Sequence, residues 1–149
     1  MNRGFALAAL ITLASGAAAA QENAARPEVG KPVQEAQSLI REKKFAAALA
    51  ALDKANAVAK KSAYETYVVE ETRAAAELGA GDYGAATNAV EAVLATHILP
   101  AADAQKRLLT LVQLQYQQKD YAKTVAAADR YYEAGGADPE PRRLMAQSY

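Results

Sequence analysis

Apolar residues recur at steps of three and four along most of this chain, and short polar or glycine-containing breaks separate the stretches. A period near 3.6 is typical of amphipathic helices, whereas half-buried strands alternate with period two. No stretch alternates with period two, so we expect an all-α protein. The pattern predicts helices over about residues 33–42, 45–60, 62–78, 83–95, 100–117, 121–134 and 140–149.

The breaks between these stretches carry residues that begin or end helices. Ser62 is a good N-cap because its hydroxyl can accept a hydrogen bond from the first helical turn. Gly81 can end the preceding helix, since glycine adopts the left-handed C-cap conformation at little cost. Asp138 followed by Pro139 predicts the start of the last helix. We therefore expect helices joined by short turns.

An aromatic residue opens every second helix at a constant interval. Phe45, Tyr83 and Tyr121 are 38 residues apart, and each follows a short polar break and precedes an Ala-rich helical run. An interval of this size indicates one helical hairpin copied along the chain. We expect the three aromatic residues to lie in the hairpin cores.

The repeated hairpin resembles the tetratricopeptide repeat, over about residues 31–149. Aligning the chain on the three aromatic residues places the small helix-A residue and the helix-B signature on the same kinds of residue in each copy. The matched positions are Ala36, Ala74 and Val112; Ala48, Ala86 and Thr124; Leu52, Val90 and Ala128; Ala55, Val93 and Tyr131. The resemblance implies a right-handed α-solenoid of antiparallel helical hairpins, with about three repeats and one extra C-terminal helix.

The same resemblance implies a groove formed by the first helix of each hairpin, which would hold a protein or peptide. The inward positions of that groove carry amide, apolar and a few charged residues, which suit an extended or helical peptide. Val33 and Gln37 stand where the family's carboxylate clamp would have Lys and Asn, so we do not expect that clamp. The candidate groove residues are Gln37, Arg41, Glu71, Ala75, Leu109, Gln113, Tyr116 and Gln117.

The first 20 residues have the composition of a secretory signal peptide. Arg3 precedes a short apolar run, and Ala18, Ala19 and Ala20 fit the small-residue rule for cleavage before Gln21. A retained membrane anchor is the alternative, although the run is shorter than the ~20 residues that span a bilayer. We expect a periplasmic or secreted protein, without a stable membrane span after cleavage, in which residues 21–30 form a linker.

Composition favours binding over catalysis. The 17 basic and 17 acidic residues balance, and no basic run is interleaved with aromatic residues, so we expect no nucleic-acid partner. His97 is the single histidine and there is no cysteine, which leaves no set of transition-metal ligands and no nucleophile–base pair. Glu70 and Glu71 point about 100° apart on a helix, so we assign them to a solvated face. We expect no cofactor and no enzymatic activity.

Two features leave alternatives open. Tyr116, Tyr131 and Tyr132 could pack an Ala-rich core or contact a partner, and packing is the simpler explanation. The helix over 140–149 could cap the array, or it could begin a fourth repeat of a longer protein. In the second case the chain would be an oligomerisation or accessory module of an envelope complex, and the exposed helix would favour self-association.

Overall fold

The computed structural model describes residues 24–149, and within this range it is entirely helical, as the sequence predicts. The expected signal peptide over 1–20 and the first part of the linker lie outside the described residues. The helices are α2 (Pro27–Arg41), α3 (Phe45–Asn56), α4 (Ala63–Ala80), α5 (Tyr83–Ala95), α6 (Ala101–Gln117), α7 (Tyr121–Glu133) and α8 (Glu140–Ser148).

The first helix begins earlier than its hydrophobic pattern predicts. α2 starts at Pro27 rather than near Val33, so the part of the expected linker from Pro27 onward is helical. Pro27 suits a first helical turn, where its missing N–H is not needed, and Glu28 is favourable beside the positive end of the helix dipole. Val29 is fully buried, which explains why this extra turn is stable. α3 ends at Asn56, earlier than the predicted end near Lys60.

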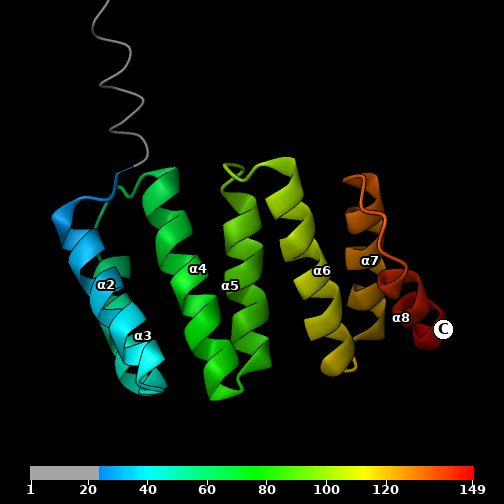
Figure 1. Ribbon diagram of the computed structural model, residues 1–149, viewed down its shortest axis with the longest axis horizontal. Helices are drawn as coiled ribbons and strands as arrows, with labels where there is room; N and C mark the ends of the chain where they lie inside the picture. Colours follow the sequence, from blue (N-terminus) through cyan, green and yellow to red (C-terminus); the bar gives the residue numbers. More distant parts are fainter. Residues whose placement is uncertain (1–23) are drawn as a thin grey trace, which may run out of the picture.

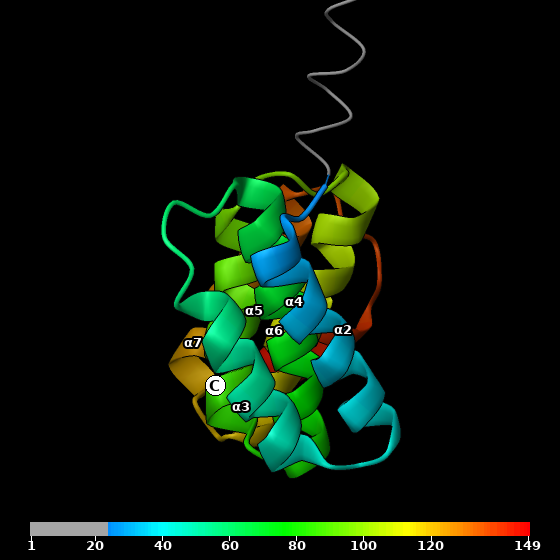
Figure 2. The same cartoon turned by 90° about the vertical axis from the view of Figure 1, so that its left-hand side faces the viewer.

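Consecutive helices pack against one another along the chain (Figure 1). α2 with α3, α4 with α5, and α6 with α7 make the most extensive contacts, and each pair also contacts the next. α2 additionally contacts α4, and α6 contacts α8. Seen from its N-terminal end, the first pair separates into α2 on one side and α3 on the other (Figure 2).

The turns within the three pairs share one geometry at the 38-residue interval. Lys43, Gly81 and Lys119 all have positive φ, at 59°, 79° and 61°. In each turn the next residue donates its backbone N–H to a carbonyl five residues earlier, over 2.8 to 3.0 Å. This hydrogen bond ends a helix in the Schellman manner. A side chain in the left-handed region is unfavourable by about 1 kcal/mol, so packing imposes this conformation on both lysines.

Small side chains fill the space between the helices. All twelve positions aligned with the tetratricopeptide signature are buried, with at most 6% of each exposed. Alanine and valine dominate these positions, and short side chains allow helix axes to approach closely. Leu52, Val69 and Leu111 supply the larger fully buried groups. The interval seen in the sequence is therefore an interval of buried contacts.

The aromatic residues that open the second helix of each pair are not core residues, contrary to expectation. Tyr83 is 36% exposed and Tyr121 is 41% exposed, and Phe45 is half-buried. The Phe45 ring lies directly over the backbone of Gly79, where an added Cβ would come within 2.2 Å of it. Tyr121 lies beside Tyr116, with ring centroids 5.9 Å apart. These rings cover the edge of the array, because each is in the first turn of its helix and beyond the buried stripe.

Two polar side chains at equivalent positions are buried without full hydrogen bonding. Glu77 Oε2 and Gln115 Oε1 are buried and have no hydrogen-bond partner among the described residues. These residues are 38 positions apart, near the C-terminal ends of α4 and α6. Burial raises the pKa of Glu77, because the charged carboxylate loses hydration that no hydrogen bond at Oε2 replaces. The ionised carboxylate of Glu77 therefore destabilises the fold at neutral pH.

We predict that Glu77→Gln raises the free energy of unfolding at pH 7 by about 1 kcal/mol, since it removes the buried charge and reproduces the residue of the next pair. A group whose pKa is raised by folding favours the folded state more as the pH falls. The advantage of the variant should therefore shrink as Glu77 becomes protonated below its raised pKa. Urea unfolding between pH 7 and pH 4 measures this, with the exposed Glu133→Gln as control. An advantage that is constant over this range would contradict the assignment.

Candidate functional site

A groove runs between α2 and α4 on the surface of the first two helix pairs. One hollow of about 320 Å³ is lined by residues of both helices near the C-terminal end of α2. A second hollow, also of about 320 Å³, lies toward the N-terminal end of α2, and Gln37 lines both. The two hollows therefore adjoin, and together they are called the α2–α4 groove below. Its lining residues are Ala24, Ala25, Gly30, Val33, Gln34, Gln37, Ile40, Arg41, Tyr64, Val68, Glu71, Thr72 and Ala75.

The sequence correctly placed half of the candidate residues at one site. Gln37, Arg41, Glu71 and Ala75 line the same hollow. They come together because the packing of α2 against α4 leaves these inward positions facing each other. The sequence missed the second hollow, where Tyr64 and Val68 provide an apolar wall opposite Gln34. Gln34 lies three residues before Gln37, so helical spacing could have placed it on the same face.

The one acidic residue that lines the groove is already neutralised. Arg107 of α6 donates from Nε to Glu71 Oε2 over 2.9 Å, and its Nη2 is bonded to Oε1. This bidentate pair is half-buried and ties α6 to α4. Glu70 instead faces Arg73, whose Nε is 3.8 Å from its carboxylate, and burial raises the pKa of Glu70. The expectation of a solvated face for both glutamates was wrong.

The other four candidate residues lie on α6, next to α8. Gln113 donates to Glu140 Oε2 over 3.2 Å, and the Tyr116 hydroxyl donates to Gln147 Oε1 over 3.0 Å. Leu109 is half-buried, and Gln117 is exposed at the end of the helix. The sequence did not predict that the last helix would occupy this part of the surface.

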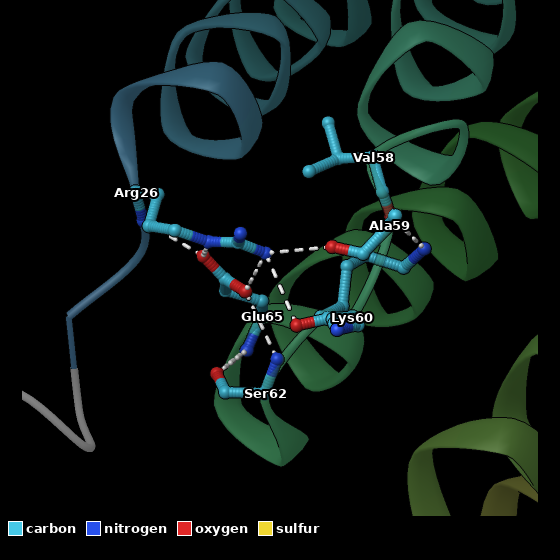
Figure 3. Close-up of polar contacts among 7 residues, drawn as sticks. Arg26, Val58, Ala59, Lys60, Ser62 and Glu65 are labelled. Carbon is cyan, nitrogen blue, oxygen red and sulfur yellow. Dashed lines mark hydrogen bonds and ion pairs between the residues drawn. The ribbon is translucent and has the colours of Figure 1, made fainter.

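An ion pair joins the beginning of α2 to the first turn of α4 (Figure 3). Arg26 donates from Nε to Glu65 Oε1 and from Nη2 to Oε2, each over 2.8 Å, and its backbone N–H also reaches Oε1. The same guanidinium lies within 3.3 Å of the carbonyl oxygens of Ala59 and Lys60. The pair therefore fixes the entry of the chain against the groove.

Glu65 also completes a capping box with Ser62. The Ser62 hydroxyl accepts from the backbone N–H of Glu65 over 3.0 Å, and Glu65 Oε2 accepts from that of Ser62 over 2.9 Å. Only 2% of Glu65 is exposed. The hydrogen bonds from the Arg26 guanidinium lower the pKa of Glu65 to about 2, against the effect of burial. The N-cap at Ser62 was predicted, but the buried glutamate was not.

A larger hollow of about 430 Å³ lies between α4 and α5. Lys61 is its one charged lining residue, and its ammonium group already donates to the carbonyl oxygens of Asn56 and Val58. The remaining lining residues are alanines and threonines, so this hollow offers a ligand little to bind. The α2–α4 groove has the better combination of apolar walls and available polar groups.

The C-terminal tyrosines hold the last loop and helix in place. Tyr131 is buried and its hydroxyl accepts from the backbone N–H of Asp138 over 3.0 Å. The Tyr132 hydroxyl donates to the carbonyl of Asp138 and accepts from the N–H of Arg142. The Arg142 guanidinium carbon lies 4.8 Å from the centre of the Tyr132 ring. The simpler explanation, a packing role, is confirmed for these two residues.

Several candidate chemistries can be placed against the described residues. His97 lies exposed in the turn after α5 with φ at 55°. Within residues 24–149 no group of three or more His, Cys, Asp or Glu is arranged to hold a metal ion. None of the helices in that range has both the length and the apolar character needed to cross a membrane. Comparison of the chain with protein-family models, curated proteins and solved structures gave no match.

We predict that Arg26→Ala lowers the Tm at pH 7, because it leaves the buried Glu65 carboxylate without its main partner. A carboxyl group whose pKa is lowered by folding stabilises the folded state above its unfolded pKa, near 4.5, and this contribution is lost as the pH falls toward 2. The difference in Tm between wild type and variant should therefore narrow over this range.

Thermal unfolding followed by circular dichroism at pH 7, 4 and 2 measures the effect. Lys106→Ala is the matched control, because Lys106 forms an exposed pair with Asp103 within α6. Exposed pairs contribute little, so the control should change the Tm only slightly. Equal losses for both variants at pH 7 would contradict a special role for the Arg26–Glu65 pair.

Proposed function

We propose that this protein is a non-catalytic adaptor that binds a protein or peptide in the α2–α4 groove. The observation that carries this proposal is the groove itself, which combines apolar walls with exposed amide and guanidinium groups. Peptide-binding surfaces typically combine pockets for side chains with polar groups that bind the peptide backbone. Val33, Tyr64 and Val68 offer the first, and Gln34 and Gln37 offer the second.

We further propose that the helix pairs form a right-handed, tetratricopeptide-like solenoid. Three observations support this proposal: the common turn geometry at the 38-residue interval, the burial of all twelve aligned positions, and the contacts between α2 and α4 and between α6 and α8. In such arrays the first helices of successive pairs line one face, which serves as the binding surface. The α2–α4 groove lies between two such helices.

The proposed location is the bacterial periplasm or the exterior of the cell. It rests on the signal-like composition of residues 1–20, which lie outside the described residues. An adaptor in that compartment would serve an envelope complex. Detection of a mature chain that begins at Gln21 in a periplasmic fraction would support this location.

We predict that Ala75→Trp abolishes binding of groove ligands. Ala75 is exposed on α4 and lines the hollow, so an indole ring there would fill the space without disturbing the core. Peptides of about 12 residues are first selected from a phage-displayed random library on the wild-type protein. Their affinities are then measured by fluorescence polarisation, and we expect a loss of about tenfold or more for the variant.

Ala50→Trp is the matched control, because Ala50 is exposed on α3, outside the groove. Both variants should keep the wild-type circular dichroism spectrum and Tm. Peptides that bind wild type and Ala75→Trp equally would sink the assignment of the groove. A wild-type protein that selects no peptide at all would count against the proposed function itself.

A further inference from the structure

Arg41 differs from every other arginine in the described part of the chain. Five of the other six form ion pairs with a glutamate or aspartate within 4.0 Å, namely Arg26, Arg73, Arg107, Arg130 and Arg143. The sixth, Arg142, lies over the Tyr132 ring. Arg41 is exposed and has neither an ion pair nor a side-chain hydrogen bond among residues 24–149. Its guanidinium is therefore available to a ligand.

The position of Arg41 makes this availability informative. Arg41 lines the hollow at the end of the α2–α4 groove, together with Gln37, which lies four residues earlier on the same face of α2. Glu71 lines the same hollow but is held by the guanidinium of Arg107. The acidic residue nearest to hand therefore has its own partner, and the hollow keeps one uncompensated positive charge.

Gln37 and Arg41 together suit a carboxylate. A guanidinium presents two parallel N–H groups that match the two oxygens of a carboxylate, and the amide of Gln37 can donate a further hydrogen bond. Ile40 and Ala75 supply the apolar walls of the hollow. The adjoining hollow is lined by Val33, Tyr64 and Val68, which suits an apolar side chain.

Resting on the proposed function, we infer that the groove binds a peptide with an acidic side chain at Arg41 and an apolar side chain in the adjoining hollow. A side-chain carboxylate fits better than a peptide C-terminus. Terminal carboxylates are typically held by free backbone N–H groups in a nest. The residues that line the hollow at Arg41 all lie within α2 and α4 beyond their first turns, where backbone N–H groups are bonded inside the helix.

The test uses the phage-displayed library described above, with each selected peptide resynthesised with an amidated C-terminus. Peptides selected on wild type should be enriched in Glu or Asp at one position. Replacing that residue by Gln or Asn should weaken binding about 10- to 100-fold, which is the usual effect of losing a charge-assisted hydrogen bond. The affinity of the acidic peptides should also fall as the salt concentration rises, because the pair is partly solvated.

Charge reversal gives the sharper result. Arg41→Glu should reject the acidic peptides and select peptides with Lys or Arg at the same position. Lys54→Glu is the charge-matched control, since Lys54 is exposed on α3 outside the groove, and it should behave as wild type. Both variants should keep the wild-type Tm, because neither residue has a partner that the substitution would leave buried.

The outcomes separate this inference from the function on which it rests. Peptides that are blocked by Ala75→Trp but show no acidic preference, or are unaffected by Arg41→Glu, would overturn the inference and leave the groove as a binding site. Peptides that bind only with a free C-terminus would overturn the side-chain assignment in favour of a terminal carboxylate. A library that yields no groove-dependent peptide would overturn both proposals.

Discussion

The structure depends on small side chains buried between consecutive helices. A single pair of short helices cannot bury its apolar stripe, so each pair here is stable only against its neighbours. Alanine at the contact positions lets the helices approach closely, and the fully buried Ala36, Ala48 and Ala86 show how little space separates them. The price is that few large groups contribute to the core, so polar contacts between pairs matter more than usual.

Three of those polar contacts join first helices of successive pairs, or the chain entry to them. Arg26 binds Glu65, Arg107 binds Glu71, and Gln113 binds Glu140. The first pair is the one with a buried carboxylate, and it combines an ion pair with a helix cap at one residue. The α2–α4 groove lies between two of these cross-links, so its walls are fixed at both ends before any ligand binds. A preformed groove of this kind loses less conformational entropy on binding.

The proposed adaptor role and the proposed acidic ligand draw on different properties of the same surface. The adaptor role depends on shape and on apolar walls, which recur wherever first helices of neighbouring pairs meet. The acidic ligand depends on Arg41, whose counterpart positions 38 and 76 residues later are Gly79 and Gln117. The charge is thus confined to the first pair. The opposite end of the array is covered by α8, whose Glu140 and Gln147 bind the α6 residues at the matching place.

The sequence by itself determined the helical class, nearly every turn, and the interval at which buried positions recur. Those properties follow from local periodicity and from capping residues such as Ser62 and Gly81, which act within one turn of their own helix. It also brought Gln37, Arg41, Glu71 and Ala75 to one site, because helical spacing fixes which residues share a face. Only the tertiary structure decided which charges are available. Glu65, Glu71 and Glu77 are alike in sequence, yet one is paired with Arg26, one with Arg107, and one has an unpaired carboxylate oxygen. Their partners lie on other helices, or are missing, and no local pattern encodes that difference. The same is true of Tyr83 and Tyr121, whose exposure depends on where the neighbouring helix ends.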